Sequence, residues 1–113
     1  MKKLFLDDIR TSEMIYDTTE AADFVVIRNY ADFVKYIKQN GLPEFISFDN
    51  DLGLGENGEL APDGYAAAKW LVYESNLDLR RLRFKVHSAN PVAAQQIRGL
   101  LNNYIRFLRG INS

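Results

Sequence analysis

Apolar residues along the chain gather into short runs, and longer amphipathic segments separate these runs. The runs at 4–6, 24–27 and 45–48, and a more polar one at 84–87, are rich in β-branched and aromatic residues and predict strands. Elsewhere, apolar side chains recur at the i, i+3, i+4, i+7 spacing of an amphipathic helix. Strands that alternate with helices predict an α/β fold, with a parallel sheet of about four strands and right-handed crossovers.

Three helices are expected from the same pattern and from residues typical of helix ends. The first has Asn29 as its N-cap and ends at Gly41. The second covers about residues 63–73. The third starts at the pair Asn90 and Pro91, since asparagine is a favoured N-cap and proline fits the first helical position.

Polar side chains follow three of the expected strands at their carboxyl ends. They are Asp7, Asp8, Asp49, Asp51, His87 and Ser88. Ligands of parallel sheets bind outside the carboxyl ends of the strands, so these side chains should converge on one rim. Clustered carboxylates suit a hard cation such as Mg²⁺, which keeps water positions open for a phosphoryl oxygen. We therefore expect Asp7, Asp8 and Asp49 to hold Mg²⁺ or another divalent cation. Asp51 either joins them or turns outward.

The loop after the third strand contains two other motifs, and neither fits its context. Glycines within residues 53–58 have the G-x-G-x-x-G spacing of a dinucleotide site, but residues 59–63 separate them from the next helix. Several carboxylates would also crowd the phosphate. A calcium-binding loop counted from Asp49 would need glycine and glutamate where Leu54 and Leu60 stand. We reject both interpretations.

Length and composition favour one globular domain that covers residues 1–113. Fourteen basic and fifteen acidic residues leave a formal charge of −1, which argues against general nucleic-acid binding. The chain has no cysteine, and no apolar run approaches the roughly 20 residues of a membrane span. We expect a cytoplasmic location and no membrane contact.

Four segments, "LDDIR", "ISFDNDLG", "DGYAAAKWL" and "VHSANP", resemble the receiver domains of response regulators. They are more closely similar to a receiver-like family proposed to process cyclic phosphates, and the resemblance covers nearly the whole chain. It implies a small, doubly wound, flavodoxin-like parallel sheet of about four strands in the order 2-1-3-4, in a three-layer or a two-layer arrangement. Asp7, Asp8 and Asp49 match the acidic residues with which receivers hold magnesium, and Ser88 matches the residue that contacts the phosphoryl group. The fifth receiver strand, with its lysine, has no counterpart here.

The leading interpretation is a magnesium-dependent phosphoesterase that acts on a cyclic or terminal phosphate of a nucleotide or RNA end. Its catalytic residues would be His87 as general acid or base, Asp49, and Ser88, which would hold non-bridging oxygens with the start of the last helix. A lone histidine is more often structural, so a second interpretation stays open. In it the chain is a degenerate receiver that senses phosphate or docks a partner without turnover.

One face of the expected sheet lacks an assigned cover. In strand order 2-1-3-4, the helices after the second and third strands lie on the same side. The other side is left to residues 9–23, expected to be a long loop, and Ser47, Lys85 and His87 make it more polar. We expect either that the last helix folds back across this face or that two chains pair there, so the protein is a monomer or a homodimer.

Overall fold

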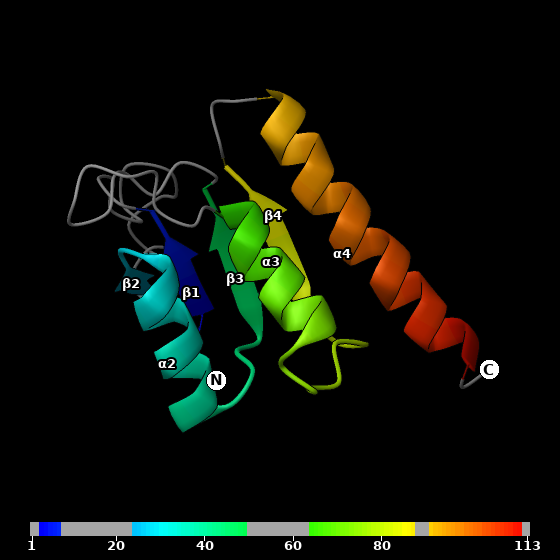
Figure 1. Cartoon of the computed structure of the whole chain (residues 1–113), viewed down its shortest axis with the longest axis horizontal. Coiled ribbons are helices and arrows are strands. Elements are labelled where there is room, and N and C mark those ends of the chain that lie inside the picture. Colours follow the sequence, from blue (N-terminus) through cyan, green and yellow to red (C-terminus); the bar gives the residue numbers. More distant parts are fainter. Residues whose placement is uncertain (1–2, 8–23, 50–63, 88–90, 112–113) are drawn as a thin grey trace.

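The structure is a computed structural model of the chain, and it describes residues 3–7, 24–49, 64–87 and 91–111. Within these ranges the elements follow in the order β1 (Lys3–Leu6), β2 (Phe24–Ile27), α2 (Tyr30–Asn40), β3 (Phe45–Phe48), α3 (Gly64–Tyr73), β4 (Arg83–Val86) and α4 (Pro91–Ile111). The strands form one parallel sheet in the order β2-β1-β3-β4 (Figure 1). The predicted α/β class and strand order are confirmed.

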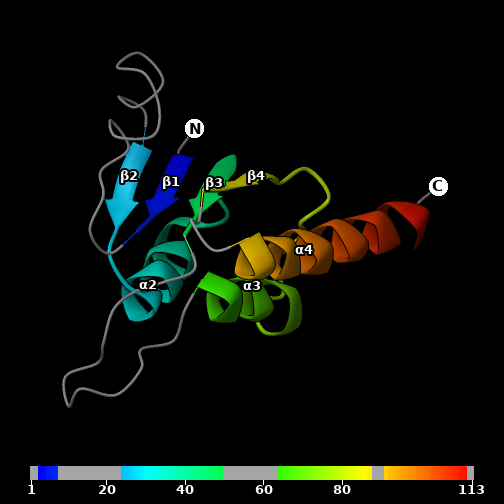
Figure 2. The ribbon, with the colours of Figure 1, turned by 90° about the horizontal axis from the view of Figure 1, so that it is seen from above.

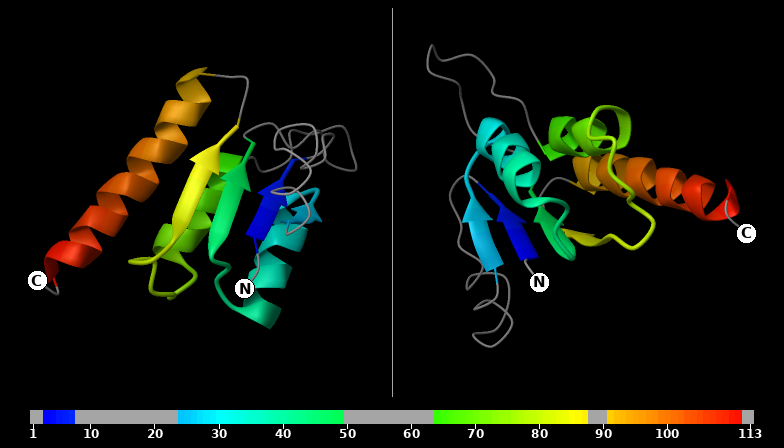
Figure 3. Two further views of the ribbon diagram at one scale, coloured as in Figure 1. Left: turned by 180° about the vertical axis from the view of Figure 1, so that it is seen from behind. Right: turned by 90° about the horizontal axis from the view of Figure 1, so that it is seen from below.

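The helices of the described residues all lie on one face of the sheet (Figure 2). Helix α2 lies beneath the β2 and β1 side, α3 lies beside it, and α4 continues the layer past β4 (Figures 2 and 3). The buried α4 side chains Ala94, Ile97 and Leu101 belong to the same core as the strands. The expectation that the last helix folds back across the other face is wrong. The apolar side chains of α4 are buried on the same face of the sheet that α2 and α3 cover. Pairing of two chains stays a prediction.

Strand alternation gives the sheet two different faces. The strands are in phase, so Leu4 lies opposite Ile46, and Leu6 opposite Phe48, in the β1–β3 register. These residues point to the helices and are fully buried, as expected from the period-two alternation of strand side chains. The alternate strand residues point to the opposite face: Lys3, Phe5, Phe24, Val26, Phe45, Ser47, Arg83 and Lys85. The polar side chains that follow the strands at their carboxyl ends lie on this second face.

Helix ends agree with the local chemistry of the sequence. Asn29 caps α2, since its Oδ1 accepts a hydrogen bond of 2.8 Å from the backbone N–H of Asp32. Gly41 ends α2 with φ of 85°, a conformation that glycine adopts without strain. Helices α3 and α4 begin at Gly64 and Pro91, close to the predicted starts. The predicted loop at 9–23 lies outside the described residues.

Strand β4 begins and ends one residue earlier than predicted, so His87 stands just past the strand. Among the helices that the structure describes, none combines the length and the apolar content needed to cross a membrane.

Candidate functional site

Three predicted site residues meet where their strands end: Asp7 after β1, Asp49 after β3 and His87 after β4. The backbone ladder continues one step past each strand. The N–H of Asp7 donates to Ile27 O at 3.0 Å, and the N–H groups of Asp49 and His87 donate to Leu6 O and Phe48 O at 2.9 Å. The strand pairing therefore extends to these three residues, and their side chains point to the same face of the sheet. One candidate ligand atom from each lies within 4.8 Å of the others.

His87 is held through both ring nitrogens. Its Nε2 lies 3.0 Å from Asp7 Oδ2, and its Nδ1 lies 2.6 Å from Ser47 Oγ. An ionised carboxylate can only accept, so Nε2–H donates to Asp7. The Ser47 hydroxyl then donates to Nδ1 of a neutral imidazole, or accepts from Nδ1 when the ring is protonated. The ring also stacks on Phe5, with centroids 4.5 Å apart and planes 6° from parallel. These contacts fix the ring orientation.

The cluster is buried as well as polar. The side chains of His87 and Asp7 are only 2% and 1% exposed, and Asp49 as a residue is 6% exposed. Two carboxylates in such surroundings repel each other and have lost much of their hydration, which destabilises both ionised forms. A cation shared between them offsets both effects. Arg28 contacts the backbone of Asp7, since its side-chain Nη1 donates a hydrogen bond to Asp7 O at 3.2 Å.

The donor set fits a divalent cation. Carboxylate oxygens are the ligands that Mg²⁺ and Mn²⁺ prefer, whereas an imidazole nitrogen in the coordination sphere favours a softer transition metal. Because His87 Nε2–H donates to Asp7, the imidazole would orient the Asp7 carboxylate from outside the coordination sphere of a bound cation. The residues present therefore suit a cation held by Asp7 and Asp49.

The remaining predicted site residues, Asp8, Asp51 and Ser88, lie outside the described residues, so their roles stay predictions. Two residues that the sequence interpretation did not place in the site belong to it. Ser47 and Phe5 lie two residues before Asp49 and Asp7, so strand alternation puts them on the same face as the cluster. That two-residue spacing is the signal that could have found them.

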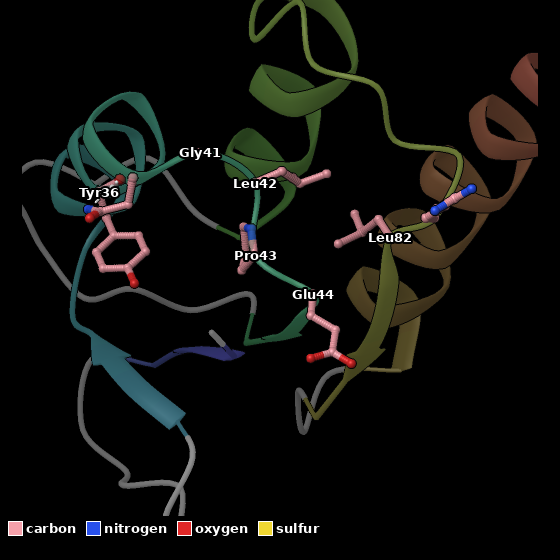
Figure 4. A pocket seen from close by; sticks show the side chains of 8 residues that line it. Tyr36, Gly41, Leu42, Pro43, Glu44 and Leu82 are labelled. Atoms are coloured by element: carbon pink, nitrogen blue, oxygen red, sulfur yellow. Dashed lines mark hydrogen bonds between the residues drawn. The ribbon is translucent and has the colours of Figure 1, made fainter. Parts of the chain in front are cut away.

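A hollow of about 450 Å³ lies at the opposite end of the sheet, where α2 leads into β3 (Figure 4). Leu42 and Leu82 point toward one another across it, and Glu44 lies at its edge. Its lining precedes β3 and β4, whereas Asp49 and His87 follow them, so the strands separate it from the acidic cluster. The mainly apolar lining offers no convergent set of catalytic groups.

The fold and the acidic rim define an α/β domain of the receiver type. Residues 2–103 match the cyclic-phosphate processing receiver domain family, and the chain belongs to that family. No curated protein is similar enough in sequence to count as a match.

Two solved structures are similar in fold. The N-terminal domain of a response regulator/sensory box/GGDEF three-domain protein from Carboxydothermus hydrogenoformans has a TM-score of 0.55, with 16% identity over 100% of both chains. A fusion that carries the yeast Spc42 trimeric coiled coil has a TM-score of 0.57 and 16% identity, over 96% of this chain and 81% of that chain. At such identity the likeness concerns the fold alone.

Proposed function

We propose that the protein is a metal-dependent phosphoesterase that processes a cyclic or terminal phosphate on a nucleotide or an RNA end. One observation carries the proposal. Asp7, Asp49 and His87, from three different strands, meet in a buried cluster at the carboxyl ends of the sheet. The chain's family, cyclic-phosphate processing receiver domains, supports the choice of phosphate as the ligand.

Asp7 and Asp49 would hold the cation, with Mg²⁺ as the first candidate, and Asp8 and Asp51 are proposed as further ligands. When bound, the cation supplies Lewis-acid polarisation of a phosphate oxygen. Ser88 and the start of α4 are proposed to hold non-bridging oxygens, since a helix amino end favours an anion. The substrate is a phosphate-bearing small molecule or an RNA end, and the protein acts in the cytoplasm.

His87 is the proposed proton carrier. Hydrolysis of a cyclic phosphate forms a bond from a water oxygen to phosphorus and breaks the bond from phosphorus to one ribose oxygen. The water loses a proton, and the leaving ribose oxygen gains one. Ser47 engages Nδ1, which leaves Nε2 as the nitrogen that faces the carboxylates and a phosphate bound beside them. The step starts from the protonated ring, in which Nδ1–H donates to Ser47. Nε2–H would exchange its Asp7 partner for the leaving oxygen and deliver its proton there, which leaves a neutral imidazole. The proton that the attacking water loses would pass to solvent, and the ring would regain one before the next turnover.

Hydrolysis of 2′,3′-cyclic nucleotides and of RNA ends with a cyclic phosphate, in the presence of Mg²⁺, tests the proposal. His87→Gln keeps a donor toward Asp7 but cannot exchange a proton near neutral pH. We expect it to retain Mg²⁺ binding while the rate falls by at least ~10²-fold. Asp49→Ala should lose metal and activity together. Turnover by the wild type no faster than by His87→Gln, across the panel of esters, would overturn the catalytic role.

A second candidate function is a receiver-like module that senses phosphate or docks a partner without turnover. The burial of the His87 ring and the use of both its nitrogens by Asp7 and Ser47 favour it, because such a histidine is typical of structural sites. Mg²⁺-dependent labelling of Asp49 by acetyl phosphate, without release of a linear phosphate from any cyclic ester, would support this second function.

A further inference from the structure

Strand β4 forms one edge of the described sheet and pairs there with β3. The backbone N–H groups of Arg83 and His87 donate to carbonyl oxygens on the β3 side, those of Glu44 and Phe48, at 3.3 and 2.9 Å. Backbone groups alternate in direction along a strand, so the N–H and C=O of Phe84 and Val86 point to the outer edge. Within the described part of the chain, no neighbouring strand pairs with that edge.

A groove of about 530 Å³ runs along this outer edge, and α4 forms its far wall. The views from two sides show the α4 ribbon diverging from β4 toward the carboxyl end of the helix (Figures 1 and 3). Apolar lining comes from Phe45, Leu82, Phe84, Val86 and Ile105. Cationic lining comes from Arg83, Lys85, Arg98 and Arg109, and none of the described lining residues is acidic.

Polar contacts hold both walls of this β4–α4 groove in place. The Arg109 guanidinium on α4 donates through Nε and Nη2 to the backbone oxygen of Arg80, at 3.2 and 2.9 Å, and so ties the end of the helix to the turn before β4. On the strand side, Arg83 pairs with Glu44 at 2.9 Å. A groove whose walls are already ordered loses less entropy when it binds a ligand.

We propose that the β4–α4 groove binds an extended acidic peptide, which adds as a strand to the outer edge of β4. The main-chain groups of Phe84 and Val86 would supply the hydrogen bonds, as in other cases of strand addition. Arg83 and Lys85 project from one face of the sheet, and Phe84 and Val86 project from the other. The peptide should therefore alternate acidic residues, beside the two cations, with apolar residues beside Phe84.

The charge of the groove selects this occupant over a second copy of the chain. Two copies paired edge to edge through β4 would bring Arg83 and Lys85 of each protomer close to those of the other, which like-charge repulsion disfavours. Charges on an edge strand can also serve only to prevent unwanted pairing. That simpler explanation predicts no affinity for the alternating peptide, so binding separates the two.

The test uses the full chain and a fluorescent heptapeptide of alternating glutamate and valine, with a block-ordered peptide of the same composition as control. We expect the alternating peptide to bind at least ~10-fold more tightly, because only its alternation matches the two faces of β4. Alternate residues of an added strand direct their N–H groups to β4, and the residues between them direct theirs to solvent. N-methylation of the residues that face β4 should therefore abolish binding, whereas N-methylation of the residues between them should not. Slower amide exchange at Phe84 and Val86 should accompany binding. Equal affinities for the two peptides, or binding that is insensitive to both methylation patterns, would overturn the proposal.

Two matched variants on α4 locate the contact. Arg98→Gln removes a positive charge from the α4 wall of the groove and should weaken peptide binding about two- to fivefold, through the screened attraction of the groove for the acidic peptide rather than through a direct ion pair. Arg106→Gln, exposed on the same helix but outside the lining, should leave it unchanged. Equal effects of the two variants would contradict the assigned groove. A single-stranded oligouridylate that binds there more tightly than the peptide would show a nucleic-acid site instead and overturn the proposal.

Discussion

The two faces of the sheet are built from the same four strands, but only one of them carries polar and ionisable side chains among its apolar ones. On the helix-covered face, alternate strand residues such as Leu4, Ile46 and Phe48 are apolar and fully buried. On the other face, Phe5 and Ser47 are each followed two residues later by Asp7 and Asp49, and His87 has the same orientation two residues after Lys85. One face forms most of the apolar core, and the other carries the cluster of Asp7, Asp49 and His87.

The same strand register determines both faces, so a short chain can form a polar cluster without elements beyond those that build its core. A shift of one residue along a strand exchanges the faces, so the register that buries the core also aligns the polar rim. Phe5 connects the two roles, since it is fully buried and its ring supports the imidazole of His87. A substitution can therefore be chosen to act on one face while the other is kept intact.

The largest effect is expected on the core face. Phe48→Ala removes a fully buried ring that contacts the rings of Phe33 and Phe84, and should lower the free energy of unfolding by about 3–5 kcal/mol. Phe24→Ala, a half-buried residue of the opposite face, should lower it by less than half as much. Urea unfolding measures both. Equal losses would show that the two faces do not differ in this way.

Mg²⁺ should stabilise the fold through the polar face alone. A cation that binds only the folded state adds about 2.7 kcal/mol at a hundredfold excess over its dissociation constant. Asp49→Asn should lose most of that gain and, in the absence of metal, should unfold at a higher temperature than the wild type because it relieves carboxylate repulsion. Asp32→Asn, at an exposed position of helix α2, is the control. Identical Mg²⁺-dependent thermal shifts in all three proteins would remove the metal site.

Ser47→Ala should have an intermediate effect. It deletes the hydroxyl that lies 2.6 Å from His87 Nδ1 and should lower the free energy of unfolding by about 1–3 kcal/mol, the usual range when a buried polar group loses a partner. The variant should also relax the ring orientation, which NMR of the His87 nitrogens would detect. An unchanged tautomer and stability would mean that Ser47 does not position the ring.

The smallest effect is expected away from both faces, at Asp78. A side-chain hydrogen bond from Arg80, helped by one from its backbone N–H, lowers the pKa of Asp78 to about 2. Because the folded pKa lies below the unfolded one, the stabilisation is fully present above about pH 4 and is lost as the pH falls through about 2. Asp78→Asn should slightly lower Tm at pH 7 and match the wild type below pH 2. A difference that persists in acid would contradict this assignment.

Much of the fold followed from the sequence because its signals are local. Asn29, Gly41 and Pro91 mark helix ends by the hydrogen bonds and backbone angles that they favour, and the apolar runs mark the strands. The convergence of Asp7, Asp49 and His87 could also be predicted, because the carboxyl ends of parallel strands meet at the same edge of a sheet.

Two features could not be predicted from local signals. The side of the sheet on which α4 lies depends on how the helix packs against α3, a contact between segments far apart in the sequence. The hydrogen bonds of His87 to Ser47 and Asp7 depend on a ring rotamer that only the assembled strands determine. The sequence placed His87 at the rim but could not say that both ring nitrogens were engaged.

A crystal structure of the protein grown with Mn²⁺ and a non-hydrolysable cyclic phosphate analogue tests the account most directly. Mn²⁺ replaces Mg²⁺ at oxygen-rich sites, and its anomalous scattering identifies the ion. We predict one anomalous peak within about 2.0–2.3 Å of a carboxylate oxygen of Asp7 and of Asp49, with the phosphate of the analogue bound to the same ion. A peak at another place, or an analogue bound far from these carboxylates, would contradict the assignment of this cluster as the catalytic metal site.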